Sequence, residues 1–275
     1  MDYSQYSLAK TGYLKEDFRL FHINDRTDRE FEWHYHDFHK IIVFVSGKVT
    51  YHIEGKAYQL KPQDILLVSQ GAIHKPEIDP SIPYERYIFW IRDDLSFPEL
   101  NTCFQKANDR SFNLIRLDSA LQEKLKDLLP EIEHSLRDAQ FGDSILSKAL
   151  FTQFMVYINR IFLKSSTAPD QKSYSSDSQV ERLLKYINRN LSENLSIDHL
   201  AERFFFSKYH MMRKFKKETG YTIHNYIISK RLLRARSLIA QGTPVMKAAM
   251  QSGFQDYTAF VRAYKKQFGT VPTQR

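Results

Sequence analysis

The sequence predicts an α+β multidomain protein, in which an N-terminal β-barrel with a helical extension precedes an all-α C-terminal domain. Three observations support this prediction. Short apolar segments alternate with turn residues between Phe31 and Arg92, which is the pattern of strands. From Asp118 to Phe162 leucine and isoleucine recur with helical spacing. Beyond Ser196 two short helix-turn-helix patterns flank one longer helix, so the C-terminal domain is expected to hold two such motifs.

The composition is that of an ordinary globular protein. The 275 residues suffice for one to two domains that each bury a core, and 42% of them are apolar and 26% charged. No apolar run approaches the roughly 18–20 residues of a membrane span, and the N-terminus lacks the apolar core of a secretory signal. The single cysteine, Cys103, excludes an internal disulfide and fits a reducing compartment. We therefore expect a cytoplasmic protein.

The positive charge of the chain is concentrated at its C-terminal end. Residues 178–275 hold 18 Lys and Arg against 6 Asp and Glu, a net charge of +12, whereas the rest of the chain carries −4. A surface that displaces counterions from nucleic-acid phosphates needs such an excess of cations. The alternative is a basic surface that is merely solvated.

The N-terminal region, residues 1–117, reads as short strands. A strand is expected over 18–23, and the apolar run from Ile41 to Val45 ends at a Ser46-Gly47 turn. Val49, Tyr51 and Ile53 then alternate with polar residues. Further strands are expected over 57–60, 64–68 and 84–91, and this regular punctuation favours a sandwich or barrel.

Two segments of this region resemble the motifs of the cupin family. His34-Tyr35-His36, Lys40 and Gly47 have the spacing of the first motif, and Lys61-Pro62-Gln63-Asp64-Ile65 with His74 resembles the second. Lys40 stands where metal-binding cupins carry a glutamate, and Gln63 replaces a glycine. Because a cation occupies the position of a ligand, we expect no metal and no cofactor here. We expect instead a cupin-like domain with a polar effector pocket lined by Trp33, His34, His36, Lys40, Tyr51 and His74.

Residues 118–163 are expected to form a helical pair. Leu125, Leu128 and Ile132 follow one stripe that Pro130 should kink or divide. A second helix over 144–162 has a broad apolar face, which is a candidate dimer surface or, alternatively, packs on the barrel. Residues 164–178 are rich in serine without apolar periodicity and are expected to form a flexible linker.

The segment 179–275 contains two copies of one pattern, in which a short amphipathic helix, a tight turn and a second helix with exposed cations follow one another. Ser196 and Ser207 are placed to cap two helices of the first copy, and Gly220 ends the second of these. In the second copy Pro244 suits a first helical turn and Asp256 can cap the last helix. Its inner face is expected to include Ala248, Ala249 and Met250. A long helix over 223–240 joins the copies.

This segment resembles the DNA-binding domain of the AraC/XylS family of transcription regulators. The resemblance covers residues 180–275 and rests on Leu200-Ala201, Ser207, Phe215-Lys216-Lys217, Glu218-Thr219-Gly220, Tyr226, Arg231, Ala235, Leu238, Gly253-Phe254, Phe260, Lys265-Lys266, Phe268-Gly269 and Pro272. The cupin-like half is similar to the effector-sensing domain of many members. Phe205 and Ala248 depart from the usual pattern at a turn and in the second motif.

The resemblance implies a non-enzymatic, sequence-specific regulator of transcription that works as a homodimer and can contact RNA polymerase. An activator is expected, and a repressor is the alternative that the sequence leaves open. A small metabolite, with a sugar as the first expectation, would control it. The alternative is a metal-dependent cupin enzyme carrying a DNA-binding tail. Base contacts are expected from Tyr209, Met212, Arg213, Tyr257, Thr258, Val261 and Arg262, and phosphate contacts from Ser207, Lys208, Lys216, Lys217, Lys265 and Lys266.

Overall fold

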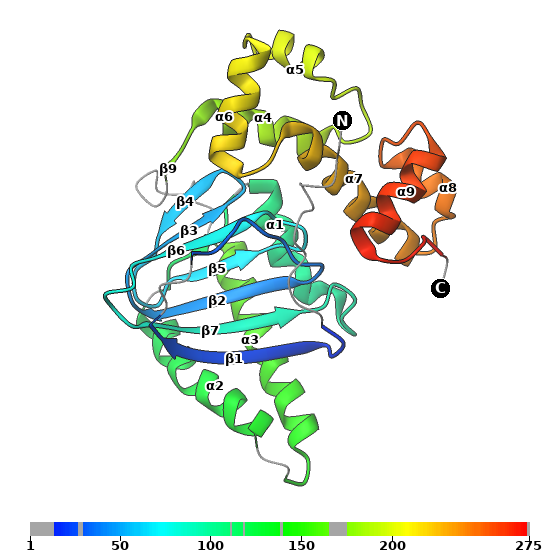
Figure 1. Cartoon of the computed structure of the whole chain (residues 1–275). Coiled ribbons are helices and arrows are strands. Elements are labelled where there is room, and N and C mark those ends of the chain that lie inside the picture. The colour runs from blue at the N-terminus through cyan, green and yellow to red at the C-terminus, as the bar shows by residue number, and fades with distance from the viewer. Residues whose placement is uncertain are drawn as a thin grey trace. The chain divides into compact units, whose positions relative to one another are not determined.

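The computed structural model describes residues 14–26, 30–110, 112–117, 119–137, 140–164 and 175–273 (Figure 1). The chain divides into two compact units, an N-terminal one that holds Thr11–Ile53 and Ala57–Ser175 and a C-terminal one built on Ser176–Arg275. Most of the linker expected over 164–178 lies outside the described residues.

The N-terminal unit contains two sheets. The larger sheet is antiparallel throughout, with β1 (Phe18–Asp25), β7 (Tyr84–Ile91), β2 (His39–Ser46), β5 (Ile65–Val68) and β8 (Leu114–Ile115) in that order. In the smaller one β6 (His74–Ile78), β3 (Val49–Ile53) and β4 (Lys56–Gln59) are neighbours. Among the described residues no ladder joins the two sheets, so the expectation of a closed barrel was wrong, while the expected α+β architecture is confirmed.

The central strand β2 is buried on both of its faces. Ile42 and Phe44 pack against residues of the smaller sheet in one core, whereas Ile41 and Val43 face a second core that is shared with helices. Because successive side chains of a strand point to opposite faces, this run is buried on both sides. Its continuous apolar sequence therefore marks a sheet covered by a helical layer.

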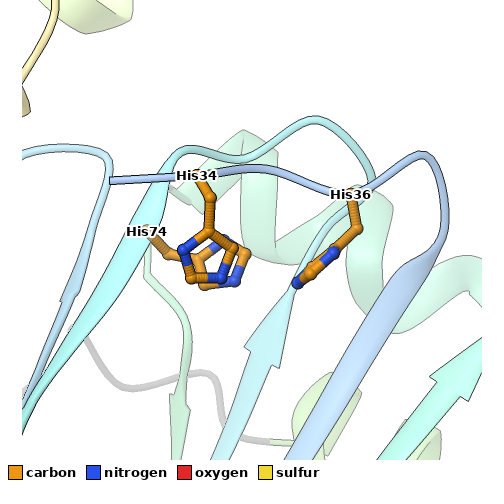
Figure 2. A group of neighbouring side chains, drawn as sticks. All are labelled: His34, His36 and His74. Atoms are coloured by element: carbon orange, nitrogen blue, oxygen red, sulfur yellow. The ribbon is translucent and has the colours of Figure 1, made fainter. Parts of the chain in front are cut away.

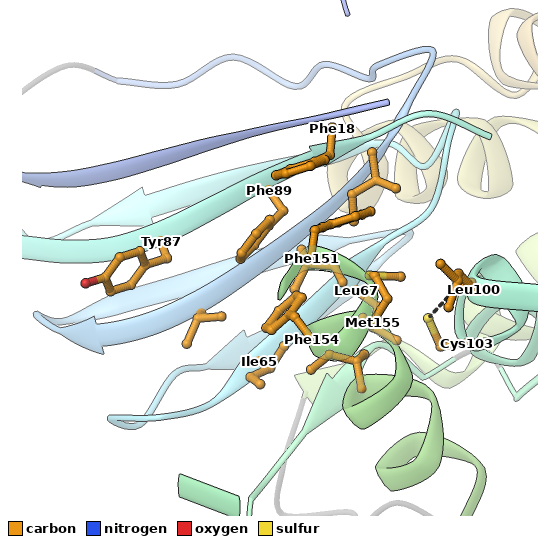
Figure 3. Packing of buried hydrophobic residues seen from close by; sticks show 14 of the residues in the cluster. Phe18, Ile65, Leu67, Tyr87, Phe89, Leu100, Cys103, Phe151, Phe154 and Met155 are labelled. Atoms are coloured by element: carbon orange, nitrogen blue, oxygen red, sulfur yellow. Dashed lines mark hydrogen bonds between the residues drawn. The ribbon is translucent and has the colours of Figure 1, made fainter. Parts of the chain in front are cut away.

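Three helices form that layer: α1 (Thr102–Arg110), which follows the short 3-10 turn η1 (Pro98–Asn101), α2 (Ser119–Arg137) and α3 (Asp143–Lys164). Phe154 of α3 stacks on Phe89 of β7 at 4.4 Å between ring centroids, and Phe151 stacks on Phe18 of β1 at 4.0 Å (Figure 3). Helix α2 continues through Pro130, so of the two expected effects of this residue, a kink or a division, the division does not occur.

The apolar face of α3 therefore belongs mainly to the core of this unit. Leu150, Phe154 and Ile158 are buried, and the exposed large apolar residues of α3 lie near its two ends, at Ile145, Leu146 and Leu163. The face proposed from the sequence as a dimer surface is thus largely occupied, because a broad apolar stripe next to a sheet packs on that sheet.

The C-terminal unit is helical. After the two-residue strand β9 (Ser175–Ser176) come α4 (Ser178–Arg189), α5 (Ile197–Arg203), α6 (Lys208–Thr219), α7 (Ile223–Ala240), α8 (Val245–Gln251) and α9 (Tyr257–Phe268). The pairs α5–α6 and α8–α9 are the two expected helix-turn-helix motifs, and α7 is the expected connecting helix. Helices α1 and α4 and strand β6 were not expected from the sequence.

Candidate functional site

The first helix-turn-helix motif has the caps that its sequence predicts. The Ser196 hydroxyl accepts from the backbone N–H of His199 at 3.3 Å and starts α5, and Ser207 accepts from that of His210 at 3.4 Å and starts α6. Gly220 ends α6 with φ 75°, the left-handed conformation that glycine adopts without strain. Met211 and Phe215 are buried, so the opposite face of α6 is exposed.

The second motif packs on the far half of α7. Leu232, Ala235 and Ile239 of α7 share a hydrophobic core with Ala248 of α8 and Phe260 of α9. The Asp256 carboxylate accepts from the backbone N–H of Ala259 at 3.0 Å and caps α9. Met250, which was expected on the inner face of α8, is 67% exposed, because the neighbouring alanines already fill the narrow contact with α7.

Arg231 links the connecting helix α7 to the loop that precedes the first motif. Its Nε donates to the Leu191 carbonyl and a terminal nitrogen donates to the Glu193 carbonyl, both at 2.8 Å. Both acceptors lie in the loop between α4 and α5. At Gly253, in the α8–α9 turn, a Cβ atom would lie 2.7 Å from Arg231 Nε and 2.1 Å from the Leu191 carbonyl oxygen. The close approach at Gly253 therefore couples the second motif to the loop that precedes the first.

The expected base-contacting residues lie at the exposed starts of α6 and α9, with one exception. Val261 is half-buried and packs against the hydrophobic core of the second motif, which leaves only part of its side chain available. The Arg213 guanidinium lies 5.8 Å from the centre of the Tyr209 ring. The exposed members are Tyr209, Met212, Arg213, Tyr257, Thr258 and Arg262.

The expected phosphate-contacting residues lie on the same two helices, with Ser207 and Lys208 at the start of α6 and the other four in the last turns of α6 and α9. Ser207 is exposed but its hydroxyl is engaged as the cap of α6. Lys208 forms an ion pair with Asp198 of α5, which would have to compete with a phosphate for the ammonium group. The remaining four cations, Lys216, Lys217, Lys265 and Lys266, are exposed.

The N-terminal unit brings His34, His36 and His74 together (Figure 2). One ring nitrogen of each lies within 4.8 Å of the others. The backbones of His34 and His74 exchange two hydrogen bonds, of 3.1 and 2.9 Å, although they lie forty residues apart in the sequence. Within the described part of the chain no Asp or Glu joins this group.

Backbone carbonyls orient two of these imidazoles. His34 Nδ1 lies 2.8 Å from the Glu32 carbonyl oxygen, and His74 Nδ1 lies 2.9 Å from that of Ala72. A carbonyl oxygen only accepts, so each Nδ1 carries the proton and each neutral ring keeps its lone pair on Nε2. Burial lowers the pKa of His34 and lowers that of His74 well below its usual value, so both rings are neutral at pH 7.

Two further residues of the expected effector pocket lie near the histidines. The Lys40 side chain is buried, and burial together with the Arg86 charge lowers its pKa to about 8. The charge of Lys40 also lowers the pKa of both His34 and His74, so the ammonium group acts directly on the cluster. The Tyr51 ring stacks on that of His74, with centroids 5.9 Å apart.

The Trp33 ring does not contact the rings of the cluster formed by His34, His36 and His74. Its ring lies beside His52 and Lys75, which alternate with Tyr51 and His74 along β3 and β6 and so face the other side of the sheet.

Trp90 was not expected at this site. Its ring stacks on that of Phe38 at 4.6 Å and lies 6.0 Å from the ring of His36. Trp90 of β7 lies directly opposite Lys40 of β2 in the sheet, so both side chains are on the same face. The alternation of side chains along β7 was the signal in the sequence that could have placed Trp90 there. The buried Trp90 Nε1 and His74 Nε2 atoms have no hydrogen-bond partner among the described residues.

No helix in the described ranges is both long and apolar enough to cross a membrane.

Comparison with known proteins identifies both units. The family profile of the AraC-like ligand binding domain matches residues 19–155, and that of a helix-turn-helix domain matches residues 200–275. The HTH-type transcriptional activator RhaR of Mannheimia succiniciproducens is 23% identical over 246 residues, which cover 89% of this chain and 86% of that protein. RhaS of Escherichia coli is 21% identical over 246 residues, with 88% and 86% coverage.

Among solved structures, the DNA-binding domain of AdpA in complex with a target DNA is 26% identical and covers 35% of this chain and 87% of that one, with a TM-score of 0.34. The two matched families follow each other in the order that the resemblance in the sequence predicts. The chain is a member of the AraC family of DNA-binding transcription regulators, with an N-terminal ligand-binding domain for a small effector and a C-terminal helix-turn-helix domain.

Proposed function

We propose that this protein activates transcription by reading an operator through α6 and α9. The observation that carries the proposal is the pair of capped helices whose exposed N-terminal halves bear Arg213 and Arg262. A recognition helix reads base edges with the side chains of its N-terminal half. Two such helices in one unit suit successive major grooves, roughly 34 Å apart along the duplex.

Each reading helix offers two kinds of base contact. Arg213 and Arg262 suit the O6 and N7 acceptors of guanine, a pairing worth about 1–3 kcal/mol of discrimination. Met212 offers an apolar surface for a thymine methyl, and the part of Val261 that is not packed offers less of one. Tyr209, Tyr257 and Thr258 complete the set of base contacts that we propose.

Phosphate contacts would fix the register of the helices on the duplex without reading sequence. We assign this role to Ser207 and to the cations Lys208, Lys216, Lys217, Lys265 and Lys266. The net charge of +12 on residues 178–275 supports the assignment.

The base-reading role is tested with an operator selected by the wild-type protein from a pool of random duplexes. Arg213→Ala should weaken binding to the selected operator by about 5- to 150-fold, the equivalent of 1–3 kcal/mol, and binding to random duplex much less. Arg189→Ala, which removes an exposed arginine of α4, is the matched control and should leave the ratio unchanged. Equal losses of Arg213→Ala on both duplexes would refute base reading.

The phosphate role has a different signature. Lys216→Ala should weaken binding to both duplexes and reduce the slope of log K against log salt concentration by about 1. Lys126→Ala, at an exposed position of α2, serves as the control and should leave the slope as it is. An unchanged slope in Lys216→Ala would remove this residue from the phosphate contacts.

We also propose that a small polar metabolite, with a sugar as the first candidate, binds beside His34, His36, Lys40, Tyr51 and His74 and shifts the protein between states with different operator affinity. Buried polar atoms without a partner in the described chain support a polar ligand. A thermal-shift screen with mono- and disaccharides tests the proposal. A ligand that stabilises the wild type but not Lys40→Met would support it, and equal stabilisation of both would remove Lys40 from the site.

We propose further that the protein is a cytoplasmic, non-enzymatic homodimer that contacts RNA polymerase at its promoters. The named relatives are transcriptional activators, which supports this reading. The division that we propose is a sensing domain over 1–117, a helical pair over 118–163, a linker over 164–178 and a DNA-binding domain over 179–275. Sedimentation at micromolar concentration tests the dimer, and a monomer under these conditions would remove it.

A further inference from the structure

We propose that Lys214 is a positioning residue, which holds the reading helix α6 in place by binding the capped start of α4. The inference rests on the proposed function of α6 and deepens it, since it adds a residue that acts through Arg213 without touching DNA. Helices α4 and α6 lie side by side in the C-terminal unit (Figure 1). The Lys214 ammonium group lies 2.8 Å from a carboxylate oxygen of Asp177 and donates to the side-chain oxygen of Gln179 at 2.6 Å.

The place of Lys214 on α6 distinguishes it from the exposed cations of that helix. Lys214 follows the buried Met211 by three residues and directly precedes the buried Phe215, so it belongs to the stripe of α6 that faces the interior of the unit. Its side chain is only 23% exposed, whereas the neighbouring Arg213 is exposed. A lysine rarely occupies such a position unless its charge has a partner. The partner here is the start of α4.

The Asp177 carboxylate serves both helices at once. One of its oxygens accepts from the backbone N–H groups of Gln179 and Val180, at 3.0 and 3.2 Å, and so caps α4. The other oxygen accepts from Lys214. Burial acts to raise the pKa of Asp177, but the bonds from Lys214 and from the two N–H groups outweigh it and lower this pKa, so the carboxylate is charged at pH 7. One charged group therefore fixes the first turn of α4 and α6 relative to each other.

The depth of the ion pair gives it more effect than a surface pair. The side chains of Asp177 and Lys214 are 27% and 23% exposed, so water and salt screen their attraction less than that of a fully exposed pair. Gln179 supplies a second acceptor for the same ammonium group. Arg213 precedes Lys214 on the same turn of α6, so a shift of α6 that the pair prevents would move the guanidinium relative to the base edges.

The test uses the full-length protein and three duplexes: the operator selected by the wild type, and two versions in which one half is scrambled. Arg213→Ala and Arg262→Ala identify the halves read by α6 and α9, because each variant loses affinity only where the half that its arginine reads is intact. Lys214→Met keeps the aliphatic part of the side chain. It should bind the intact operator about 5- to 20-fold more weakly, a loss within the range of one guanine contact.

The scrambled duplexes separate positioning from general destabilisation. On the duplex whose α6 half is scrambled, Lys214→Met should bind like the wild type, because no α6 contact is left to lose. A merely structural role would weaken binding to all three duplexes alike. That result would overturn the proposal, as would full affinity of Lys214→Met for the intact operator.

Three further variants isolate the ion pair. Asp177→Asn keeps an acceptor for the cap of α4 but removes the charge, so it should reproduce the loss of Lys214→Met. The double variant should lose no more than either single one, and additive losses would refute the pair. Lys214→Arg keeps a cation and should recover most of the affinity. Lys185→Met is the matched control, since Lys185 pairs with Glu181 within α4, and a loss of the same size there would equally overturn the proposal.

The same duplexes distinguish this proposal from base reading. If Arg213→Ala loses affinity only where the α6 half is intact and Lys214→Met loses none, the positioning role alone is refuted. If Arg213→Ala weakens binding to all three duplexes equally, base reading by α6 is refuted and the positioning role with it.

Discussion

Replacing Gly253 by alanine should destabilise the DNA-binding unit more than any other single added methyl group at its glycine turns. Gly253 has φ +97°, where a residue with a Cβ is strained by about 1–3 kcal/mol. The new Cβ would also lie 2.1 Å from the Leu191 carbonyl oxygen, so the α8–α9 turn has to move away from Arg231 and Leu191. Weakening the hydrogen bond between these two residues adds roughly 1.5–3 kcal/mol, because its donor is charged.

The expected loss in the free energy of unfolding is therefore on the order of 2.5–6 kcal/mol, a large part of the stability of such a domain. For a unit of this size it corresponds to a fall in Tm of at least about 10 °C, measured by circular dichroism or calorimetry. Gly242→Ala is the matched control, since Gly242 has φ +88° but no atom within 4 Å of the added Cβ. If Gly253→Ala lowers Tm no more than Gly242→Ala does, the coupling through Arg231 is refuted.

Three further experiments test the cap of α9, the burial of Cys103 and the buried charge of Lys40. Asp256→Ala removes the cap of α9 and should cost about 1 kcal/mol of unfolding free energy, whereas Asp256→Asn, which keeps an acceptor for the Ala259 N–H, should cost much less. Because burial raises the pKa of the Cys103 thiol to about 12, a thiol reagent at pH 8 should modify this residue only after unfolding; rapid reaction of the native protein would contradict its burial. Burial and the charge of Arg86 lower the pKa of Lys40 to about 8 in the folded protein. Below pH 8 the buried charge therefore destabilises the folded state fully. This destabilisation declines as the pH rises from 8 toward 10.5, the pKa of lysine in the unfolded chain. Lys40→Met should therefore raise Tm most near pH 7, and a difference from wild type that grows between pH 8 and pH 10 would contradict this reasoning.

The helix-turn-helix pair was predictable because its signals are local. Ser196, Ser207 and Asp256 cap helices in the structure, and Gly220 ends α6 as expected. A cap acts on backbone groups two or three residues away, so the sequence itself contains both partners of the interaction.

The histidine cluster was only partly predictable. Spacing placed His34 and His36 together, and the cupin-like pattern added His74, but the contributions of Trp90 and of the backbone acceptors depend on strand pairing. Trp33 was assigned to the pocket, yet it lies beside His52 and Lys75. Which face of a sheet a side chain occupies follows from register, and a shift of one residue reverses it.

The sequence by itself determined the order of the two domains, the two helix-turn-helix motifs, the capped starts of α6 and α9, and the concentration of positive charge after residue 178. Only the tertiary structure decided that the strands form two separate sheets and that the apolar face of α3 is buried in the core. It also decided that Arg231 of α7 bonds to the α4–α5 loop. Caps, turns and charge act over a few residues, whereas burial and the pairing of distant segments depend on which surfaces the whole chain brings together.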